Sequence, residues 1–523
     1  MARLFTNVPL DASASSPTEV RFRIPSDPVT LDWNKATGAS ETFVLMNIMQ
    51  GLVQEDGNLR PSPALAAVWK TSDEGRHWSF ELKAGLNWSD GAPLRAQHFR
   101  DSWIRLMDPK TQSPFADFLD DIVNAKEFRQ GKVPASAVGI QVQGDRVIEV
   151  RLKRPSPWFL HLLTFWPTFP IRLDQVKGQP DNWGDPARLV TLGNWKLASW
   201  KKGARIELVR NLKSTPLDSE GSKGGMKPFE RVVLTIEKND SKARKDFEAG
   251  RTDFLLDATT ADLMKKSDMQ TRVEQFPYLA THYLGFVTSR PPLSNKELRK
   301  ALALAIEPES LPSLLQGGQK VAHGLIPPGI DGHESGAALR GSSHEARAAL
   351  VRAGFREGEG LAPLRLSIRR FDGAEKLAAH LSTLWRERLG IEVKAEVNDA
   401  EVHQRLIQSG KVDLFVQHWG ADFPDAANFF EVFRTGAGSN RTGWGDAEFD
   451  RIVEEARDLQ DPRVRAERYQ QAERILLQDQ VAIFPLFHRK NTVLVGRRVG
   501  SLKISPLNYL FFDKILAADS SKK

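Results

Sequence analysis

The chain has 523 residues, a net charge of +7 and no cysteine. A chain of this length is usually too long for one hydrophobic core, so we expect two or three domains. The lack of cysteine excludes cysteine nucleophiles, disulfides and Cys-ligated metals or iron–sulfur clusters. The positive charge is modest and dispersed, which argues against a nucleic-acid binder and fits an anionic neighbourhood such as an envelope surface.

The N-terminal segment MARLFTNVPLDASASS is polar and has no apolar core of the length that a signal peptide needs. No later stretch is apolar enough to span a membrane. We therefore expect either a cytosolic chain or an exported chain whose export segment is not visible.

In the first half of the chain, alternating apolar residues predict short strands. These are VRFRIP (20–25), WSFELKAG (78–85), VIEVRL (147–152), RIELVR (205–210) and RVVLTI (231–236). Helical spacing predicts SETFVLMNIMQGL (40–52), with Ser40 as its N-cap, and AQHFRDSWIRLMD (96–108). Residues 212–228, rich in Ser, Gly, Lys and Pro, predict a surface loop.

From residue 277 onward, the pattern becomes a clear α/β alternation. Ser294 and Glu297 have the spacing of a capping box at the start of SNKELRKALALAI. The helix KLAAHLSTLWRERLG should end at Gly390, before the strand IEVKAEV. A helix at 467–479 precedes a predicted buried strand, AIFPLF (482–487). The whole pattern predicts a mixed α/β protein of several domains.

Common catalytic signatures are absent, so no enzyme activity is expected. The chain has no Gly-x-Ser-x-Gly elbow and no phosphate-binding loop, and its 11 histidines show no ligand spacing. No cofactor or metal is therefore predicted. The pairs Asp120/Asp121 and Asp422/Asp425 leave a peptide or glycan hydrolase as an alternative, although adjacent acidic residues usually form a solvated face.

Asp422 needs an explanation, because it lies in HWGADFPDAANFF (418–430) among several aromatic residues and follows an apolar stretch. A carboxylate is rarely buried without a partner. One interpretation is an N-cap for the helix that follows, although Asp425 is better placed for that role. The other is that a ligand supplies the partner.

Several stretches, in order, resemble the peptide-binding type of extracytoplasmic solute-binding proteins of ABC importers (family 5), and most of all the oligopeptide-binding proteins. They are SDPVTLDWN (26–34), GLVQEDGNLRPSPALAAVW (51–69), WSFELKAGLNWSDGAPLRAQHFRDSWIRLMDPKTQSPFA (78–116), TLGNWKLASWKKGARIELVRN (191–211), PYLATHYLGFVTSRPPLSNKELRKALALAI (277–306) and HWGADFPDAANFFEVFRTGAGSNRTGW (418–444). Each stretch is moderately specific, but six in order, covering nearly the whole chain, are strong evidence.

The resemblance implies an α/β, two-lobed periplasmic-binding-protein fold (type II, cluster C), with a hinge and a third small inserted domain. The implied division is 1–50, 175–276 and 489–523 for lobe I, 51–174 for the small domain and 277–488 for lobe II. It also implies a periplasmic, monomeric receptor that delivers peptides to the permease and ATPase subunits of an importer.

For the binding site, the resemblance implies that Asp422 in Trp419-Gly420-Ala421-Asp422 pairs with the free α-amino group of a peptide. The peptide would lie as an added strand between Trp419-Gly420 and Thr37-Gly38-Ala39. The remaining residues implied at the cleft are Phe115, Tyr278, Tyr283 and Asn440. Trp419, Tyr278 and Phe115 are equally compatible with core packing, since aromatic residues mostly fill cores.

The sequence departs from the family where basic residues meet the peptide C-terminus. Gln316, Ala374, Ile407 and Val416 stand at positions where Lys, His and two Arg are expected. His403, Arg405, Arg369 or Arg370 are candidate substitutes. Arg489 replaces a cleft Tyr, either as a new cationic contact or as a lobe-surface residue. Peptide length and C-terminal preference thus stay open, and murein peptides, nickel or haem complexes (through His418, His403 and His488) and sugars are alternative ligands.

Overall fold

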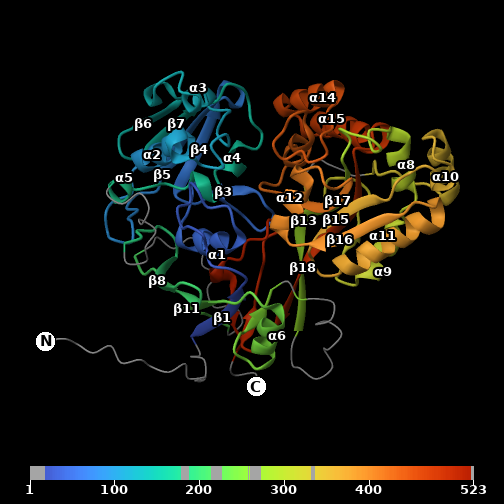
Figure 1. Cartoon of the computed structure of the whole chain (residues 1–523). Helices are drawn as coiled ribbons and strands as arrows, with labels where there is room; N and C mark the ends of the chain where they lie inside the picture. Colours follow the sequence, from blue (N-terminus) through green and yellow to red (C-terminus); the bar gives the residue numbers. More distant parts are fainter. Residues whose placement is uncertain are drawn as a thin grey trace.

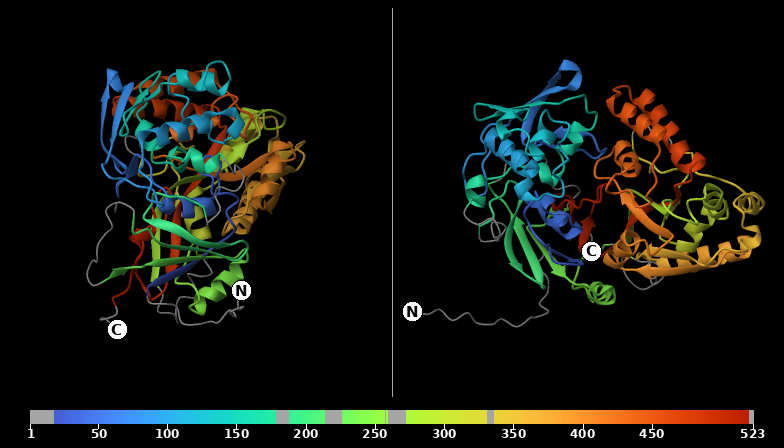
Figure 2. Two further views of the ribbon diagram at one scale, coloured as in Figure 1. Left: turned by 90° about the vertical axis from the view of Figure 1, so that its left-hand side faces the viewer. Right: turned by 45° about the horizontal axis from the view of Figure 1, so that its top comes forward.

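The computed structural model describes residues 18–177, 188–213, 226–256, 258, 272–330 and 336–519. Two large bodies lie side by side, and a smaller body sits above one of them (Figure 1). Two further views show the same separation (Figure 2). We refer to the lower left body as lobe I, the upper left body as the small domain and the right-hand body as lobe II.

Lobe I is built around the parallel pair β1 and β11, whose register runs from Glu19↔Arg231 to Ile24↔Ile236. Its elements are β1 (Glu19–Ile24), α1 (Ala39–Ile48), β8 (Trp195–Lys201), β9 (Arg205–Arg210), β11 (Arg231–Ile236), α6 (Asp240–Glu248) and β12 (Phe254–Leu255). A separate small sheet joins β10 (Lys227–Pro228), β20 (Leu516–Ala517) and β19 (Val499–Ser501).

The small domain is a four-stranded antiparallel sheet in the order β4-β5-β7-β6, covered by α2. Its elements are β4 (Ala66–Ser72), β5 (His77–Leu82), α2 (Ala96–Met107), α3 (Ala125–Arg129), β6 (Ile140–Gln143), β7 (Val147–Arg151), α4 (Phe159–Leu162) and α5 (Leu173–Val176). The hairpin β2 (Val53–Glu55) and β3 (Pro61–Pro63) precedes this sheet.

Lobe II carries the α/β alternation expected after residue 277. Its elements are α8 (Lys296–Leu304), α9 (Leu311–Leu315), β14 (Lys320–Val321), α10 (Ser343–Arg352), β15 (Leu364–Arg369), α11 (Ala374–Leu389), β16 (Val393–Asn398), α12 (Ala400–Gln408), β17 (Leu414–Gly420), α13 (Ala427–Phe430), α14 (Ala447–Asp458) and α15 (Pro462–Arg474). One core of Leu, Ile and Ala side chains fills the space between α8, α10, α11 and the sheet.

Two long strands, β13 (Arg272–Phe286) and β18 (Ile483–Val495), run from lobe II toward lobe I. They pair with each other and place the strands of both lobes in one 11-stranded sheet. Ten strands follow the order β16-β15-β17-β13-β18-β12-β1-β11-β9-β8, and β14 pairs with β18 beside this path. The expected divisions at residues 277 and 488 fall inside these two strands, and the division into domains stays a prediction.

Several expected elements are confirmed and several differ. The strands at 205–210 and 231–236 match β9 and β11, and α11 ends with Gly390 in the left-handed region at φ 69°. The helix expected at 40–52 is shorter and begins after Gly38, so Ser40 lies inside α1 and bonds Ser26 instead of capping. The helix expected at 467–479 begins earlier, at Pro462, and its last five residues form a π-helical turn.

One further expectation is wrong, and one is confirmed only in part. The predicted capping box of Ser294 and Glu297 does not form, because the side chain of Asn295 accepts the hydrogen bonds from the first turn of α8. The strand expected at 482–487 is twice as long, since its polar continuation pairs with β13. Much of the loop expected at 212–228 lies outside the described residues.

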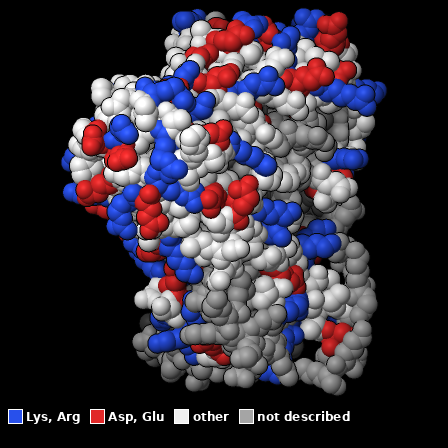
Figure 3. Space-filling view, turned by 90° about the vertical axis from the view of Figure 1, so that its right-hand side faces the viewer, with Lys and Arg blue, Asp and Glu red and all other residues white. Residues whose placement is uncertain are grey.

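The surface is mixed in charge. On the lobe II side, Lys and Arg are interspersed with Asp and Glu (Figure 3), as the dispersed charges of the sequence indicate. Of the helices that the structure describes, none has the length and apolar character of a membrane span.

Candidate ligand-binding cleft

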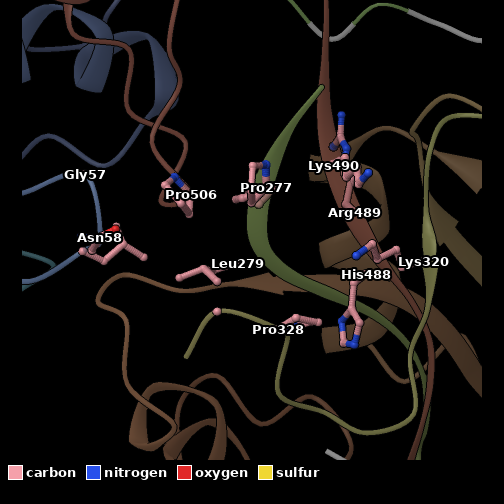
Figure 4. Close-up of a pocket in the computed structure, with 13 residues that line it drawn as sticks. Gly57, Asn58, Pro277, Leu279, Lys320, Pro328, His488, Arg489, Lys490 and Pro506 are labelled. Atoms are coloured by element: carbon pink, nitrogen blue, oxygen red, sulfur yellow. The ribbon is translucent and has the colours of Figure 1, made fainter. Parts of the chain in front are cut away.

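A cavity of about 350 Å³ lies beside the middle of β13 and β18, and we call it the hinge cavity (Figure 4). Residues 277–279 of β13 and 488–490 of β18 form one wall, together with Lys320 of β14. Residues 57–59 and Pro506 face them from the other side. Tyr278 and Arg489, both expected at the cleft, line this cavity.

The turn at 57–59 is held by the hairpin β2–β3, in which Asp56 accepts hydrogen bonds from the backbone of Asn58 at 2.7 Å and Arg60 at 3.0 Å. These bonds are the first cause of a pKa of Asp56 below its usual value. Leu59 takes the left-handed conformation at φ 61° that this turn requires. The cavity wall from this side is therefore a fixed turn.

A second cavity of about 510 Å³ adjoins the first and shares Gly57, Leu59 and Pro506 with it. Its lining contains both signs of charge, including Glu55 and Lys503. Burial raises the pKa of Glu55, whose carboxylate lies near the His161 ring.

Asp422 lies just after the end of β17 and is half-buried. Its backbone N–H donates to the side-chain oxygen of Asn428 at 3.1 Å, and that same oxygen accepts from the indole of Trp419 at 3.0 Å. The amide nitrogen of Asn428 lies 3.5 Å from the carboxylate. Within the described ranges, no Lys, Arg or His forms an ion pair with Asp422.

Burial raises the pKa of Asp422 to about 6, against the smaller opposing effect of the Asn428 hydrogen bond. The alternative role as a helix N-cap is not what the structure shows. Asp425 accepts from Ala427 at 2.8 Å and also binds Arg465. Of the two carboxylates, Asp422 is therefore the one that pairs with no cation of the described residues.

The residues before Asp422 end a strand that has an unoccupied edge. On one side β17 pairs with β13, with Trp419 opposite Thr281 and Gly420 opposite Ala280. On the other side, β15 pairs with β17 only as far as Ile368↔Val416. Beyond that pair, no strand of the described residues lies on this edge, so residues 417–420 offer their backbone to an added strand.

Gly420 and Tyr278 are in close contact. A Cβ at position 420 would lie 2.8 Å from the Tyr278 hydroxyl oxygen. The next residue, Ala421, donates its N–H to Leu279 at 2.8 Å. These contacts join the Asp422 segment directly to the wall of the hinge cavity.

The segment Thr37-Gly38-Ala39 stands at the N-terminus of α1. Thr37 and Ala39 are exposed, as an edge for a bound peptide requires, but neither lines the two cavities. A side chain at Gly38 would overlap the Glu41 carboxylate, whose oxygen accepts from Val29 at 2.6 Å.

Three expected site residues are engaged elsewhere in the fold. Tyr283 is buried inside lobe II, where Gln417 donates to its hydroxyl. Asn440 donates to the carbonyls of Phe433, Arg434 and Trp444 and so holds a loop together. Phe115 packs edge-on against Phe165 and Trp166 in the small domain. The structure does not bring these three to the hinge cavity.

The structure separates the candidate substitutes for the missing C-terminal clamp. Arg405 pairs with Glu401, and Arg370 pairs with Asp399 and Glu375. His403 is buried against Ser367, and burial lowers its pKa to about 4.

Arg369 is different. Desolvation lowers the pKa of its guanidinium, the charge of Arg489 acts in the same direction, and Tyr278 acts against it. Arg369 does not line either cavity, and no acidic residue of the described part pairs with it.

The carboxylate pairs of the hydrolase alternative are bound to arginines. Asp120 pairs with Arg129, Asp121 with Arg154 and Arg457, and Asp425 with Arg465. In the part of the chain that the structure describes, no three His, Cys, Asp or Glu side chains gather as metal ligands. His418 stacks on His282 at 4.9 Å between ring centres, and burial lowers the pKa of His418 to about 3.

Sequence reasoning missed Asn428, Lys320 and Lys490. Asn428 orients both Trp419 and Asp422, but nothing in the sequence distinguishes it from a helix residue. Lys320 and Lys490 come together only because β14 pairs with β18, with Lys320 opposite His488.

Two α/β lobes joined by paired crossing strands, with a cavity at the crossing, define a hinged ligand-binding protein. The model of the bacterial extracellular solute-binding proteins, family 5, matches residues 60–441. The chain therefore belongs to this family.

The relatives cover nearly the whole chain. The probable deoxycholate-binding periplasmic protein YgiS of Escherichia coli is 28% identical over 97% of this chain and 94% of that protein. The periplasmic oligopeptide-binding protein OppA of Salmonella typhimurium is 28% identical over 91% and 88%. The structure of the Escherichia coli murein tripeptide binding protein MppA superposes with a TM-score of 0.82 at 25% identity, over 96% and 98%.

Proposed function

We propose that this protein is an extracytoplasmic receptor that captures peptides by their free N-terminal amine and delivers them to an ABC importer. The observation that carries the proposal is Asp422, a half-buried carboxylate that pairs with no cation of the described chain. It lies beside an open strand edge and next to the hinge cavity.

The physical argument concerns the cost of burying a charge. A desolvated carboxylate is unfavourable alone, and an ammonium group that brings charge-assisted hydrogen bonds offsets that cost. Asn428 and Trp419 hold the segment in place, so little side-chain ordering is needed when the ligand arrives. A ligand with a blocked amine would leave the charge unpaired.

The backbone edge at residues 417–420, with Thr37-Gly38-Ala39 opposite, would bind the peptide main chain. Main-chain hydrogen bonds do not depend on the side chains of the ligand. Tyr278 and Arg489 in the hinge cavity would contact the part of the peptide beyond its first residues. We accordingly expect a receptor of broad sequence specificity that acts as a monomer with permease and ATPase partners and has no catalytic activity.

The experiment is calorimetric titration with peptides of two to five alanines and with their N-acetylated forms. Because Asp422→Asn removes one partner of a desolvated charge pair, we expect at least tenfold weaker binding of the free-amine peptides. Asp117→Asn, at an exposed position in the small domain, is the control and should bind as the unaltered protein does. Equal affinity for free and acetylated peptides would refute the assignment.

A second candidate is a ligand with a carboxylate and no amine. The observation that favours it is the hinge cavity itself, which combines apolar Leu59 and Leu279 with cationic residues. One relative is named for deoxycholate binding, and a bile acid has this chemistry. Binding of deoxycholate, with no binding of any peptide, would establish this candidate in place of the first.

A further inference from the structure

The hinge cavity gathers positive charge. Lys320, Arg489 and Lys490 all line it, and none of its described lining residues is acidic. The adjoining cavity, by contrast, is lined by residues of both signs. An excess of one sign in a partly enclosed space concentrates the electrostatic potential there.

The two lysines, Lys320 and Lys490, have no paired counter-charge among the described residues. In the described ranges, no Asp or Glu forms an ion pair with Lys320 or Lys490. The charges of the two lysines repel each other in the empty protein, and a bound anion would relieve that repulsion.

His488 does not contribute to this charge. The hydroxyl of Thr281 donates its single hydrogen to the Leu325 carbonyl at 2.7 Å, so at 2.9 Å its oxygen accepts from Nδ1 of His488. Burial lowers the pKa of His488 to about 4, aided by His323 and Lys320. The ring is therefore neutral near pH 7, and the positive charge belongs to the lysines and Arg489.

We propose that the hinge cavity is the subsite for a carboxylate of the ligand, held by Lys320, Arg489 and Lys490. This inference rests on the proposed function, since it defines the far end of a ligand whose amine binds Asp422. It makes the preferred ligand a zwitterion with one carboxylate placed away from its amine. The carboxylate is either the C-terminus of a short peptide or an acidic side chain.

The subsite accounts for the departure from the family pattern. Gln316, Ala374, Ile407 and Val416 carry no charge at the positions where relatives place basic residues. Here the cations come instead from β18, which crosses between the lobes, and from β14, which pairs with it. A guanidinium can bind a carboxylate through two parallel hydrogen bonds, so Arg489 is suited to fix its orientation.

The test compares matched peptides that differ only in one negative charge. One pair is trialanine and its C-terminal amide, and the other is Ala-Glu-Ala amide and Ala-Gln-Ala amide, each titrated by calorimetry. We expect the charged member of at least one pair to bind at least tenfold more tightly, because charged hydrogen bonds contribute more than neutral ones. Preference in the first pair identifies the C-terminus, and preference in the second identifies a side chain.

The variants locate the effect. In Lys320→Gln/Lys490→Gln, and separately in Arg489→Gln, we expect the preference for the charged peptide over its neutral partner to fall below threefold. Lys394→Gln, on the exposed face of β16, is the control and should keep the full preference. Asp422→Asn should lose the preference for a free amine and keep the preference for the carboxylate.

Two results would overturn the inference. Equal affinities within both peptide pairs would do so, and so would an unchanged preference in the cavity variants. If no peptide binds at all, the proposed function fails, and the subsite is then tested with deoxycholate and its methyl ester. Binding of the acid alone, lost in the lysine double variant, would keep the subsite, and no binding of either would reject it.

Discussion

In the proposed function, the protonation state of Asp422 decides whether the cleft can hold an amine. Its neighbours Asn428 and Trp419 supply order but no charge, so desolvation dominates and holds its pKa at about 6. A neutral carboxylic acid has little attraction for an ammonium group. The carboxylate exists only above this pKa, and ligand capture should follow its titration.

We therefore expect peptide affinity to fall as the pH is lowered through about 6. Between pH 7 and pH 5 the ionised fraction drops about tenfold for such a pKa, and the affinity should drop by about the same factor. Titration calorimetry across this range measures it. Asp422→Asn should show a flat profile, and an equally steep profile in the variant would contradict the assignment.

The raised pKa of Asp422 affects the stability of the empty protein in the opposite direction from ligand binding. A raised pKa means that the folded state binds the proton more tightly than the unfolded chain, whose carboxyl titrates near 3.8. The contribution of this group is fully present below that value and is lost as the pH rises through about 6. Melting temperatures of the empty protein and of Asp422→Asn should diverge over that interval.

Among the strands, the contact between β17 and β13 connects the amine site to the hinge cavity. Gly420 is the point of closest approach, because any side chain there meets the Tyr278 hydroxyl. An added side chain at position 420 would clash with the outer end of the Tyr278 ring, which lies in the cavity wall. Movement of Tyr278 can relieve this clash. The consequence should therefore appear in binding more than in folding.

We predict that Gly420→Ala weakens peptide binding about tenfold or more and lowers the melting temperature by only a few degrees, as expected for a local rearrangement. Calorimetry and thermal denaturation measure the two effects. Gly438→Ala, where an added Cβ meets no atom within 4 Å, is the matched control. In Gly420→Ala/Tyr278→Phe, part of the affinity should return, and no recovery would count against the clash as the cause.

The sequence predicted those elements whose signals are local. The alternation in RVVLTI matches β11, and Gly390 ends α11 because a glycine readily takes the left-handed conformation. It predicted the buried start of β18 and missed its continuation, because HRKNT is polar and its strand character comes from pairing with neighbouring strands. The sequence also did not show which residue caps α8. Ser294 and Asn295 both suit the N-cap position, and Asn295 takes it in the structure.

The residues of the candidate site also differ in whether local sequence signals could identify them. Asp422 could be selected from the sequence because a carboxylate between aromatic residues is costly wherever it lies. The cationic wall could not, because Lys320 and Lys490 meet only through strand pairing. For Tyr283 the structure differs from the sequence-based prediction. Tyr278 lines the hinge cavity, but Tyr283 is buried in the core of lobe II.

Considered as a whole, the molecule has a bridge between the small domain and lobe II at the side of the cleft. Arg154 pairs with Glu454 of α14, and Arg457 of α14 pairs with Asp121 at 3.0 Å. Trp158 stacks on Phe423 with ring centres 6.2 Å apart. Because Phe423 follows Asp422 directly, the segment that holds the proposed amine site also contacts the opposite body.

We expect Trp158→Ala to weaken peptide binding several-fold without altering the preference for a free amine, because it removes support for the arrangement in which the two bodies touch. Calorimetry with free and acetylated peptides measures both quantities, and small-angle scattering of the liganded protein should show a larger radius of gyration. Trp200→Ala, in β8 of lobe I, is the control for loss of an aromatic residue away from the bridge. Unchanged affinity in Trp158→Ala would show that the bridge has no part in closure.

The paired strands β13 and β18 have one more consequence. Their register is irregular between Pro277 and Thr281 and again between His282 and Tyr283, beside the hinge cavity. Hydrogen-bonded ladders are stiff, so bending between the lobes should concentrate at this interruption. A ligand bound in the hinge cavity would contact both strands at this interruption and would stiffen it. The ease with which the two lobes move relative to each other should then depend on whether this cavity is filled.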